Sequence, residues 1–204
     1  SEMCIRDRKH SDFYFICVSD DQILNVSKKL NVNDRVVVHL SGSTEMSILL
    51  HHQNFGVFYP LQTFSYESEL SFKEIPILIE ANNKKTLAKI NTLAKLFSRK
   101  VRKMNSKKRL ICHLSATIAN NFSNHMIVTA EKILENNKID KKLIRPLIFE
   151  TIKKLQKMNA VDAQTGPAVR NDLLTIKKHM KQLNESEFLN LYEEITKSIM
   201  SNEL

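Results

Sequence analysis

Proline and glycine become scarce partway along this chain of 204 residues. Neither occurs between Pro76 and Pro146, and neither occurs after Pro167. Because these residues are the strongest helix breakers, their absence favours long helices, and Pro146 would fall near a helix start, where proline is tolerated. The sequence predicts four such helices, over 107–136, 140–159, 168–183 and 185–200. Residues 106–204 are therefore predicted to form an all-α domain.

The first half of the chain has a different character, because short β-rich runs alternate with helical stretches. The predicted strands cover 13–18, 35–40, 55–59, 76–81 and 100–104, and the predicted helices cover 22–30, 44–51 and 83–98. This alternation is typical of a parallel sheet of the doubly wound type. The run 13–18 is apolar throughout, which indicates a strand buried on both faces. We predict α/β plus all-α, with a partial doubly wound domain over 9–105.

The first eight residues, Ser-Glu-Met-Cys-Ile-Arg-Asp-Arg, resemble the translated sequencing-adapter tail found on reading frames from metagenomic assemblies. We expect residues 1–8 to be a non-native tail, so that Met3 is not a native start and an N-terminal part is missing. An ordinary short extension is the alternative. The sheet half also begins at what would be a later strand, which agrees with truncation.

Composition excludes several classes of function. The three glycines lie far apart, so the chain has neither a G-x-G-x-x-G turn nor a P-loop. The three cysteines form no C-x-x-C pair, which excludes a zinc ribbon and a disulfide scaffold and indicates the cytoplasm. The formal net charge is +9, but the densest basic run, 99–109, has no aromatic residue for base stacking. We interpret it as a solvated face and expect no nucleic-acid partner. No apolar run approaches the ~18 residues of a membrane span, so we expect no membrane partner either.

Polar residues follow three of the predicted strands, and each set has two interpretations. In parallel sheets, ligands bind beyond the carboxyl ends of the strands, so these residues are candidates for a binding site. Alternatively, the first set caps a helix and the second forms a turn. The sets are Ser19-Asp20-Asp21, His39-Leu40-Ser41-Gly42-Ser43 and Tyr59-Pro60-Leu61-Gln62-Thr63-Phe64.

The long predicted helix carries a polar stripe. Residues His113, Thr117, Asn121 and Asn124 recur at spacings that place them on one helix face. With Asn120 and His125 nearby, this segment is rich in residues that form helices poorly, which suggests a role other than helix stability. A solvent-facing polar surface is the alternative. His113 lies among Leu110, Leu114 and Ile118, so a hydrogen-bonded interfacial histidine competes with a proton-transfer role.

A third signal lies around Gly166-Pro167, which predicts a fixed turn before a helix. Arg170 and Asp172 are predicted in the first turn of that helix, and His179 follows two turns later. Arg170 could bind a carboxylate through two hydrogen bonds. A structural Arg–Asp pair is the alternative.

Together these motifs resemble one family, the bacterial Rossmann-like proteins whose C-terminal part is domain of unknown function family 2520. The resemblance covers roughly residues 9–200, and Tyr-Pro-Leu-Gln-Thr-Phe and Thr-Gly-Pro-Ala-x-Arg-x-Asp are its specific motifs. The domain plan is similar to that of pyrroline-5-carboxylate reductase, ketopantoate reductase and the 6-phosphogluconate dehydrogenase relatives. The matching segments are His39–Ser43, Gly56–Ser65, 76–81, His113–His125 and Thr165–Asp172.

The resemblance implies a partial Rossmann-like domain that holds NAD or NADP and a 6-phosphogluconate-dehydrogenase-C-terminal-like helical domain that completes a substrate site. His113 would be the acid/base, aided by Asn121. The implied cofactor contacts are Ser19, Asp20, Ser41 and Gly42, and the implied substrate contacts are Gln62, Thr63, Asn124, His125, Arg170 and Asp172. The family's glycine-rich turn has no counterpart here, so we expect weak dinucleotide binding. Relatives often place a lysine and an asparagine one turn apart on this helix, where His113 and Asn121 stand two turns apart.

The leading interpretation is an NAD(P)-dependent oxidoreductase that acts on a small carbonyl or imine substrate between the two domains. One alternative is a ligand-binding or regulatory protein that kept the fold without turnover. Another is a helix-mediated dimer whose polar stripe lines the interface. We also expect a homodimer formed through the helical domain.

Overall fold

The computed structural model describes residues 11–64, 70–184 and 186–201, so the predicted tail at 1–8 lies outside the described residues. The chain divides into two compact units, one ending at Phe122 and the other beginning at Ser123. The change from sheet to helix predicted at 105 is seen in the secondary structure, since α4 begins at Ser106. The first unit extends beyond that change because it includes α4.

The first unit contains a five-stranded sheet in the order β1-β2-β3-β4-β5. β1 pairs with β2 in parallel, β2 with β3 in parallel, and β4 with β5 in parallel, whereas β3 and β4 are antiparallel. The carboxyl ends of β1, β2 and β3 therefore meet at one edge of the sheet. The strands are β1 Phe13–Ile16, β2 Val36–His39, β3 Asn54–Pro60, β4 Ile77–Ala81 and β5 Val101–Lys103.

The prediction of a wholly parallel sheet is wrong at the β3–β4 pair. A parallel connection needs a crossover element, usually a helix. The described residues between these strands form only a short 3-10 turn, η3 (Phe72–Glu74). The Leu61 amide also donates to the Pro76 carbonyl at 2.8 Å, which extends the pairing toward the loop. The chain therefore returns beside β3 in the opposite direction.

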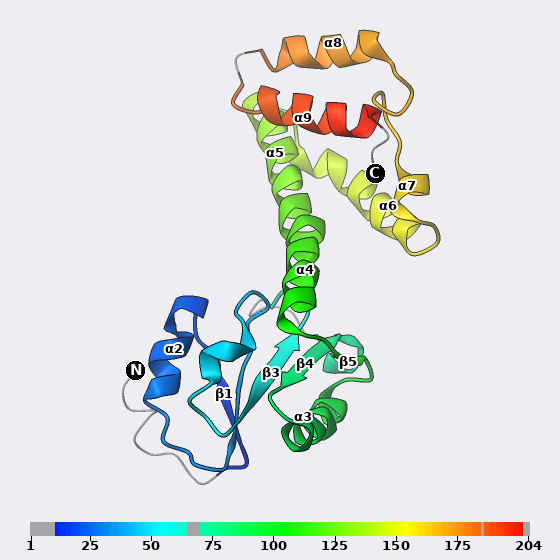
Figure 1. Ribbon diagram of the computed structural model, residues 1–204. Coiled ribbons are helices and arrows are strands. Elements are labelled where there is room, and N and C mark those ends of the chain that lie inside the picture. The colour runs from blue at the N-terminus through cyan, green and yellow to red at the C-terminus, as the bar shows by residue number, and fades with distance from the viewer. Residues whose placement is uncertain (1–10, 65–69, 185, 202–204) are drawn as a thin grey trace. The chain divides into compact units, whose positions relative to one another are not determined.

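Apolar side chains of β2 alternate between two cores, one on each face of the sheet. Val36 and Val38 pack with Ile90 and Ala94 of α3 (Lys84–Phe97), whereas Val37 packs with Ile23 of α2 (Ile23–Lys28). Figure 1 shows α2 and α3 on either side of the sheet. The helix predicted over 44–51 is only a 3-10 turn, η2 (Met46–Leu49), and another such turn, η1 (Asp20–Gln22), precedes α2.

Two burial predictions are wrong. β1 ends the strand order and is not buried on both faces, since the Phe15 side chain is 40% exposed. Arg109, in the basic run interpreted as solvated, is 1% exposed. A dense run of basic residues in the sequence does not reveal which of them face solvent. In the structure, helix periodicity turns Arg109 away from solvent, while its neighbours Lys107 and Lys108 remain exposed.

The helix predicted over 107–136 is helical throughout but changes type in the middle. α4 (Ser106–Ala116) begins at Asn105, whose side chain accepts a hydrogen bond from the Lys108 amide. A π-helical segment, η4 (Thr117–Phe122), follows, and α5 (Ser123–Asn136) continues in the second unit. Of the polar stripe predicted from the sequence, His113 lies in α4, Thr117 and Asn121 lie in the π-helical segment, and Asn124 lies near the start of α5.

The second unit, described by itself, is helical. The predicted start of the helix at 168 is wrong, because α8 begins only at Leu173. Asp172 caps it by accepting from the Thr175 amide, and Asn171 has a positive φ of 53°. Arg170 therefore precedes the helix. None of the helices among the described residues is long and apolar enough to cross a membrane. The elements after α5 are η5 Lys141–Ile144, α6 Arg145–Leu155, α7 Ala160–Ala163, α8 Leu173–Gln182 and α9 Leu189–Met200.

Candidate functional site

The three polar sets predicted at strand ends are brought together at one edge of the sheet. Asp20, after β1, accepts a hydrogen bond from the Ser43 hydroxyl, after β2. The Ser41 hydroxyl accepts from the amides of Ser43 at 3.1 Å and Thr44 at 2.9 Å. These hydrogen bonds fix the loop 41–44. Partial burial raises the pKa of the Asp20 carboxyl, but hydrogen bonds from the Ser43, Ser41 and Thr44 side chains together outweigh it, so the pKa is lowered. Ser19, before η1, is exposed.

Gly42 lies at the point where this loop meets β3 and α4. A Cβ atom built on Gly42 would lie 2.7 Å from Nδ1 of His113 and 2.7 Å from Cζ of Tyr59. Contacts that short do not occur in folded proteins, so no larger residue fits without displacing a ring. The absence of a side chain therefore lets the loop close against both aromatic rings.

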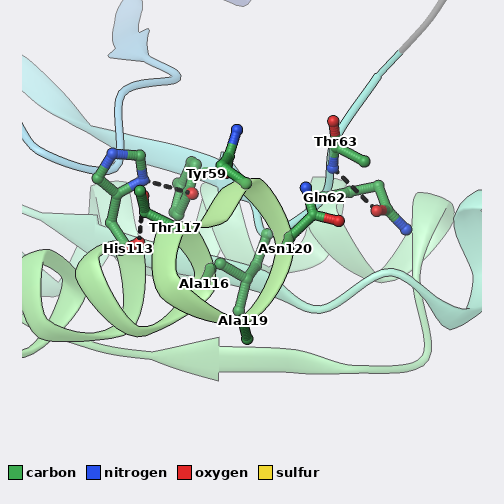
Figure 2. A pocket seen from close by; sticks show the side chains of 10 residues that line it. Tyr59, Gln62, Thr63, His113, Ala116, Thr117, Ala119 and Asn120 are labelled. Atoms are coloured by element: carbon green, nitrogen blue, oxygen red, sulfur yellow. Dashed lines mark hydrogen bonds between the residues drawn. The ribbon is translucent and has the colours of Figure 1, made fainter. Parts of the chain in front are cut away.

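A pocket of about 430 Å³ opens beside these rings, entirely within the first unit. Figure 2 shows the helix that carries His113, Thr117 and Asn120 on one side and the loop that carries Gln62 and Thr63 on the other. Four predicted site residues thus share one pocket, whereas Ser41 is not among its lining residues. The lining comprises Tyr59, Leu61, Gln62, Thr63, His113, Ala116, Thr117, Ala119, Asn120 and Asn121.

Tyr59 and His113 form a hydrogen-bonded pair at the end of this pocket. Tyr59 Oη and His113 Nδ1 lie 3.1 Å apart, and the rings meet edge to face with centroids 6.0 Å apart. Burial raises the pKa of the Tyr59 phenol, and the charge of Arg109 acts in the opposite direction. His113 was predicted from the sequence as a site residue, whereas Tyr59 was named only within the polar set after the third strand and had no role assigned to it. The Tyr-Pro-Leu-Gln-Thr-Phe motif, which begins at Tyr59, was the available signal.

The helical wall of the pocket is the π-helical segment. Thr117, Asn120 and Asn121 come from it, and the Thr117 hydroxyl donates to the His113 carbonyl at 3.0 Å. π-helical turns are rare and occur frequently at functional sites. The asparagines that seemed unsuited to a helix interior therefore lie where the helix departs from α geometry, with their amides at the pocket.

The charge of the pocket is determined by a few groups around it. The described residues that line the pocket include no carboxylate, ammonium or guanidinium group. His39, behind the loop 41–44, is fully buried, and its Nδ1 accepts from the Ser41 amide at 3.1 Å. Burial and the charge of Arg109 lower the pKa of His39 to about 4. At neutral pH, His39 is therefore uncharged.

Four predicted substrate residues belong to the second unit. Asn124 and His125 are exposed near the start of α5, and Arg170 is exposed before α8. The carboxylate of Asp172 caps α8 and also accepts from the Thr175 hydroxyl at 2.7 Å. Their substrate role stays a prediction. The described residues contain no group of three or more His, Cys, Asp or Glu side chains that could hold a metal ion.

A mostly parallel sheet followed by helices, with a pocket at the strand ends, defines a class of protein. It is the Rossmann-like domain joined to a helical domain of the 6-phosphogluconate dehydrogenase C-terminal type. Within this class, the chain belongs to the family of the Domain of unknown function DUF2520, whose model matches residues 75–199. No curated protein matches the sequence.

Several solved structures have a similar fold. A candidate NADP oxidoreductase from Bacteroides fragilis is 31% identical, with a TM-score of 0.90 over 97% of this chain and 79% of that one. A protein from Thermotoga maritima is 25% identical, with a TM-score of 0.79 over 95% and 79% of the two chains. A reductive aminase from Aspergillus terreus, in complex with NADPH and ethyl-5-oxohexanoate, has a TM-score of 0.64 over 92% and 75%. It is 9% identical, so this last similarity is one of fold.

Proposed function

We propose that the protein is an NAD(P)H-dependent reductase of small carbonyl or imine compounds. The observation that carries the proposal is the Tyr59–His113 pair, which lines a pocket at the carboxyl edge of a Rossmann-like sheet. In such sheets this edge is where ligands bind. The similarity to a candidate NADP oxidoreductase from Bacteroides fragilis supports the same class of reaction.

A bound nicotinamide would supply a hydride to the carbonyl or imine carbon. The electron pair of the C=O or C=N bond then moves to the heteroatom, which needs one proton. When the Tyr59 hydroxyl donates to Nδ1 of His113, the neutral imidazole carries its hydrogen on Nε2. As Nε2 gives that proton to the heteroatom, Nδ1 takes the proton of the Tyr59 hydroxyl, so the imidazole stays neutral. Solvent then returns a proton to the Tyr59 phenolate. Tyr59 keeps the ring in the tautomer that can donate.

The amide side chains of the pocket orient the substrate in this scheme. Gln62 comes from the loop after β3, and Asn120 and Asn121 come from the π-helical wall. Each amide can donate and accept hydrogen bonds. They can therefore hold a polar, uncharged substrate without changing the charge of the pocket, while Ala116 and Ala119 leave space for its apolar part.

The proposed cofactor contacts fit the nicotinamide of a dinucleotide better than its pyrophosphate. These contacts are Ser19, Asp20, Ser41 and Gly42. The loop 41–44 lies against Tyr59 and His113, where a nicotinamide would have to reach. A pyrophosphate needs backbone N–H groups at a glycine turn and a helix N-terminus, and the Asp20 carboxylate would repel it. We expect isothermal titration with NADPH to show affinity weaker than micromolar. Sub-micromolar affinity would show that residues other than a glycine turn and a helix N-terminus hold the phosphates.

The proposal is tested by NADPH and NADH consumption, followed by absorbance with a panel of small aldehydes, ketones and cyclic imines. High cofactor concentrations compensate for weak binding, and the Bacteroides fragilis relative is assayed in parallel. Turnover of a carbonyl or imine by this chain, lost in His113→Asn, supports the proposal. If neither protein oxidises either cofactor with any compound, the proposal is wrong. Ligand binding at the pocket without turnover would favour the non-catalytic alternative.

Homodimerisation through the helical unit stays part of the proposal. The second unit exposes large apolar side chains, among them Leu143 at 69%, Leu147 at 68% and Phe149 at 72%. A second copy of the chain would remove this surface from water. Light scattering coupled to size exclusion should give twice the chain mass, and Leu147→Glu should halve it. A monomeric parent protein would contradict the dimer without affecting the reductase proposal.

A further inference from the structure

Arg109 is the most deeply buried charged side chain among the described residues, with 1% exposure. Its Nη1 donates to Glu80 of β4 at 2.5 Å, and its Nη2 donates to the carbonyl of Thr44 at 2.5 Å. Nη2 also reaches the Ser106 hydroxyl at 3.1 Å. One guanidinium therefore joins α4, β4 and the loop 41–44. We call Arg109, Glu80 and Ser106 the clamp.

Ser106 makes the clamp more specific than a simple ion pair. Its hydroxyl donates to Glu80 at 2.8 Å and accepts from the Met46 amide at 3.1 Å. The same carboxylate oxygen of Glu80 thus receives both Ser106 and Arg109. The start of α4 is consequently tied to the backbone on both sides of Glu45, immediately after the loop that contains Gly42.

The clamp lies next to the Tyr59–His113 pair. Arg109 precedes His113 by four residues, so the two side chains lie one turn apart on the same face of α4. Thr44, which Arg109 holds, is two residues from Gly42, which contacts both rings of the pair. Both rings pack against Gly42, and Arg109 ties the loop that contains Gly42 to α4, which carries His113.

We propose that Arg109 is a positioning residue, which holds α4 against the loop 41–44 so that the Tyr59–His113 hydrogen bond is formed in the ligand-free protein. The inference rests on the proposed function, because it gives the clamp a role in preparing the proton donor. It assigns no contact between Arg109 and the substrate, since Arg109 is not among the residues that line the pocket.

The charge of Arg109 supports the same role. It lowers the pKa of His39 together with burial, and it opposes the rise that burial causes in the pKa of Tyr59. Both groups border the loop 41–44. The Nε of Arg109 has no hydrogen-bond partner, so its burial is not explained by complete satisfaction of its donors. A group buried at this cost is consistent with a role beyond stability.

The test separates positioning from stability. Arg109→Met alone leaves the Glu80 carboxylate without its cation, so it destabilises the fold. The double variant R109M/E80M removes both charges and leaves apolar groups, an exchange that is often neutral for stability. Arg102→Met, which removes an exposed arginine of β5 from the same unit, is the control for loss of one positive charge. Thermal unfolding confirms that each variant is folded.

The readout is the pair of imidazole ¹⁵N shifts of His113, measured by NMR without ligand at about pH 8.5, above the ordinary histidine pKa. Tyr59→Phe defines the values with the hydrogen bond absent. We expect R109M/E80M to match Tyr59→Phe and Arg102→Met to match the parent protein. Parent-like shifts in the double variant would overturn the proposal, as would identical shifts in the parent and Tyr59→Phe. Because no cofactor or turnover is involved, failure of the reductase proposal would be seen separately.

Discussion

Each unit of this protein contains a histidine–tyrosine pair, and the two pairs have nearly the same internal geometry. In the first unit, Tyr59 Oη and His113 Nδ1 are 3.1 Å apart, and the rings meet at 73°. In the second, Tyr192 Oη and His179 Nδ1 are 2.9 Å apart, and the rings meet at 79°. The contact alone therefore does not distinguish a functional pair from a structural one.

The surroundings differ, and they decide what each pair can do. The Tyr59–His113 pair is half-buried, touches the Gly42 loop and lines a pocket. The Tyr192–His179 pair joins the neighbouring helices α8 and α9 at the surface, and His179 is exposed. At a surface, one hydrogen bond to a neighbouring side chain stabilises an imidazole little, because water can replace it. Beside a pocket, the same bond fixes which nitrogen faces a ligand. The comparison predicts that equal substitutions will have unequal effects.

Catalysis should show the largest difference. His113→Asn removes the proposed proton donor and should lower kcat/KM for carbonyl or imine reduction by about 10²–10⁴-fold, the usual contribution of general acid catalysis. His179→Asn should leave kcat/KM unchanged. Steady-state kinetics with NADPH measure both. Equal losses in the two variants would show that the pairs act only through the fold.

Ion pairs allow the same comparison for stability. Arg109–Glu80 in the first unit and Lys141–Glu135 in the second have N–O distances of 2.5 Å and 2.6 Å. Their side chains are 1% and 16% exposed in the first pair but 41% and 51% exposed in the second. Arg109→Met should lower the free energy of unfolding by about 3–5 kcal/mol, because it leaves a partly buried carboxylate without its cation. Lys141→Met should lower it far less, because water solvates Glu135 in either case. Urea unfolding measures both, and similar losses would contradict this account.

Acid pH should weaken the first unit through His39. Its pKa falls from an ordinary value of 6.5 to about 4 in the folded state, mainly through burial. Below pH 6.5 the unfolded chain therefore binds a proton that the folded chain does not. This contribution is fully present above pH 6.5 and is lost as the pH falls toward 4, by up to about 3 kcal/mol.

The measurement is the free energy of unfolding against pH for the parent protein and His39→Gln. Burial also lowers the pKa of His52, but His52 and the carboxylates are present in both proteins. The variant should therefore lose only the part of the pH dependence that comes from His39, whatever its absolute stability. His179→Gln in the second unit is the matched control and should follow the parent curve. Parallel curves for the parent and His39→Gln would show that the pKa of His39 is the same in the folded and the unfolded chain.

The sequence was sufficient to predict features that depend on local pattern. Apolar runs located the strands, and the lack of glycine and proline located the helical half. The polar residues after β1, β2 and β3 were expected at one edge because parallel strands end together, and the contacts of Asp20 with Ser43 and of Gly42 with Tyr59 place them there. The family was also predicted from short sequence motifs, and the family model that matches residues 75–199 confirms it.

Features that depend on distant partners were missed. Strand direction at β4 is set by what the connection contains, and residues 61–76 carry no periodic signal of their own. The role of Tyr59 depends on its hydrogen bond to a histidine 54 residues away in the sequence. Without that partner, a tyrosine in a buried strand is ordinarily interpreted as a core residue. Arg109 lies in a basic run, where only the fold reveals that it faces Glu80 and Thr44.

The smallest expected difference concerns the two tyrosine hydroxyls. Tyr59→Phe removes the partner of a half-buried imidazole nitrogen that water reaches poorly, so it should cost about 1–3 kcal/mol. Tyr192→Phe removes a hydrogen bond of similar length at the surface, where water replaces it. It should lower the free energy of unfolding by about 0.5 kcal/mol. Both changes delete one oxygen atom and leave the edge-to-face ring contact in place, so they isolate the effect of the surroundings. Thermal unfolding of both variants provides the measurement. If Tyr192→Phe costs as much as Tyr59→Phe, the surroundings do not distinguish the pairs, and the case for a special environment at His113 is lost.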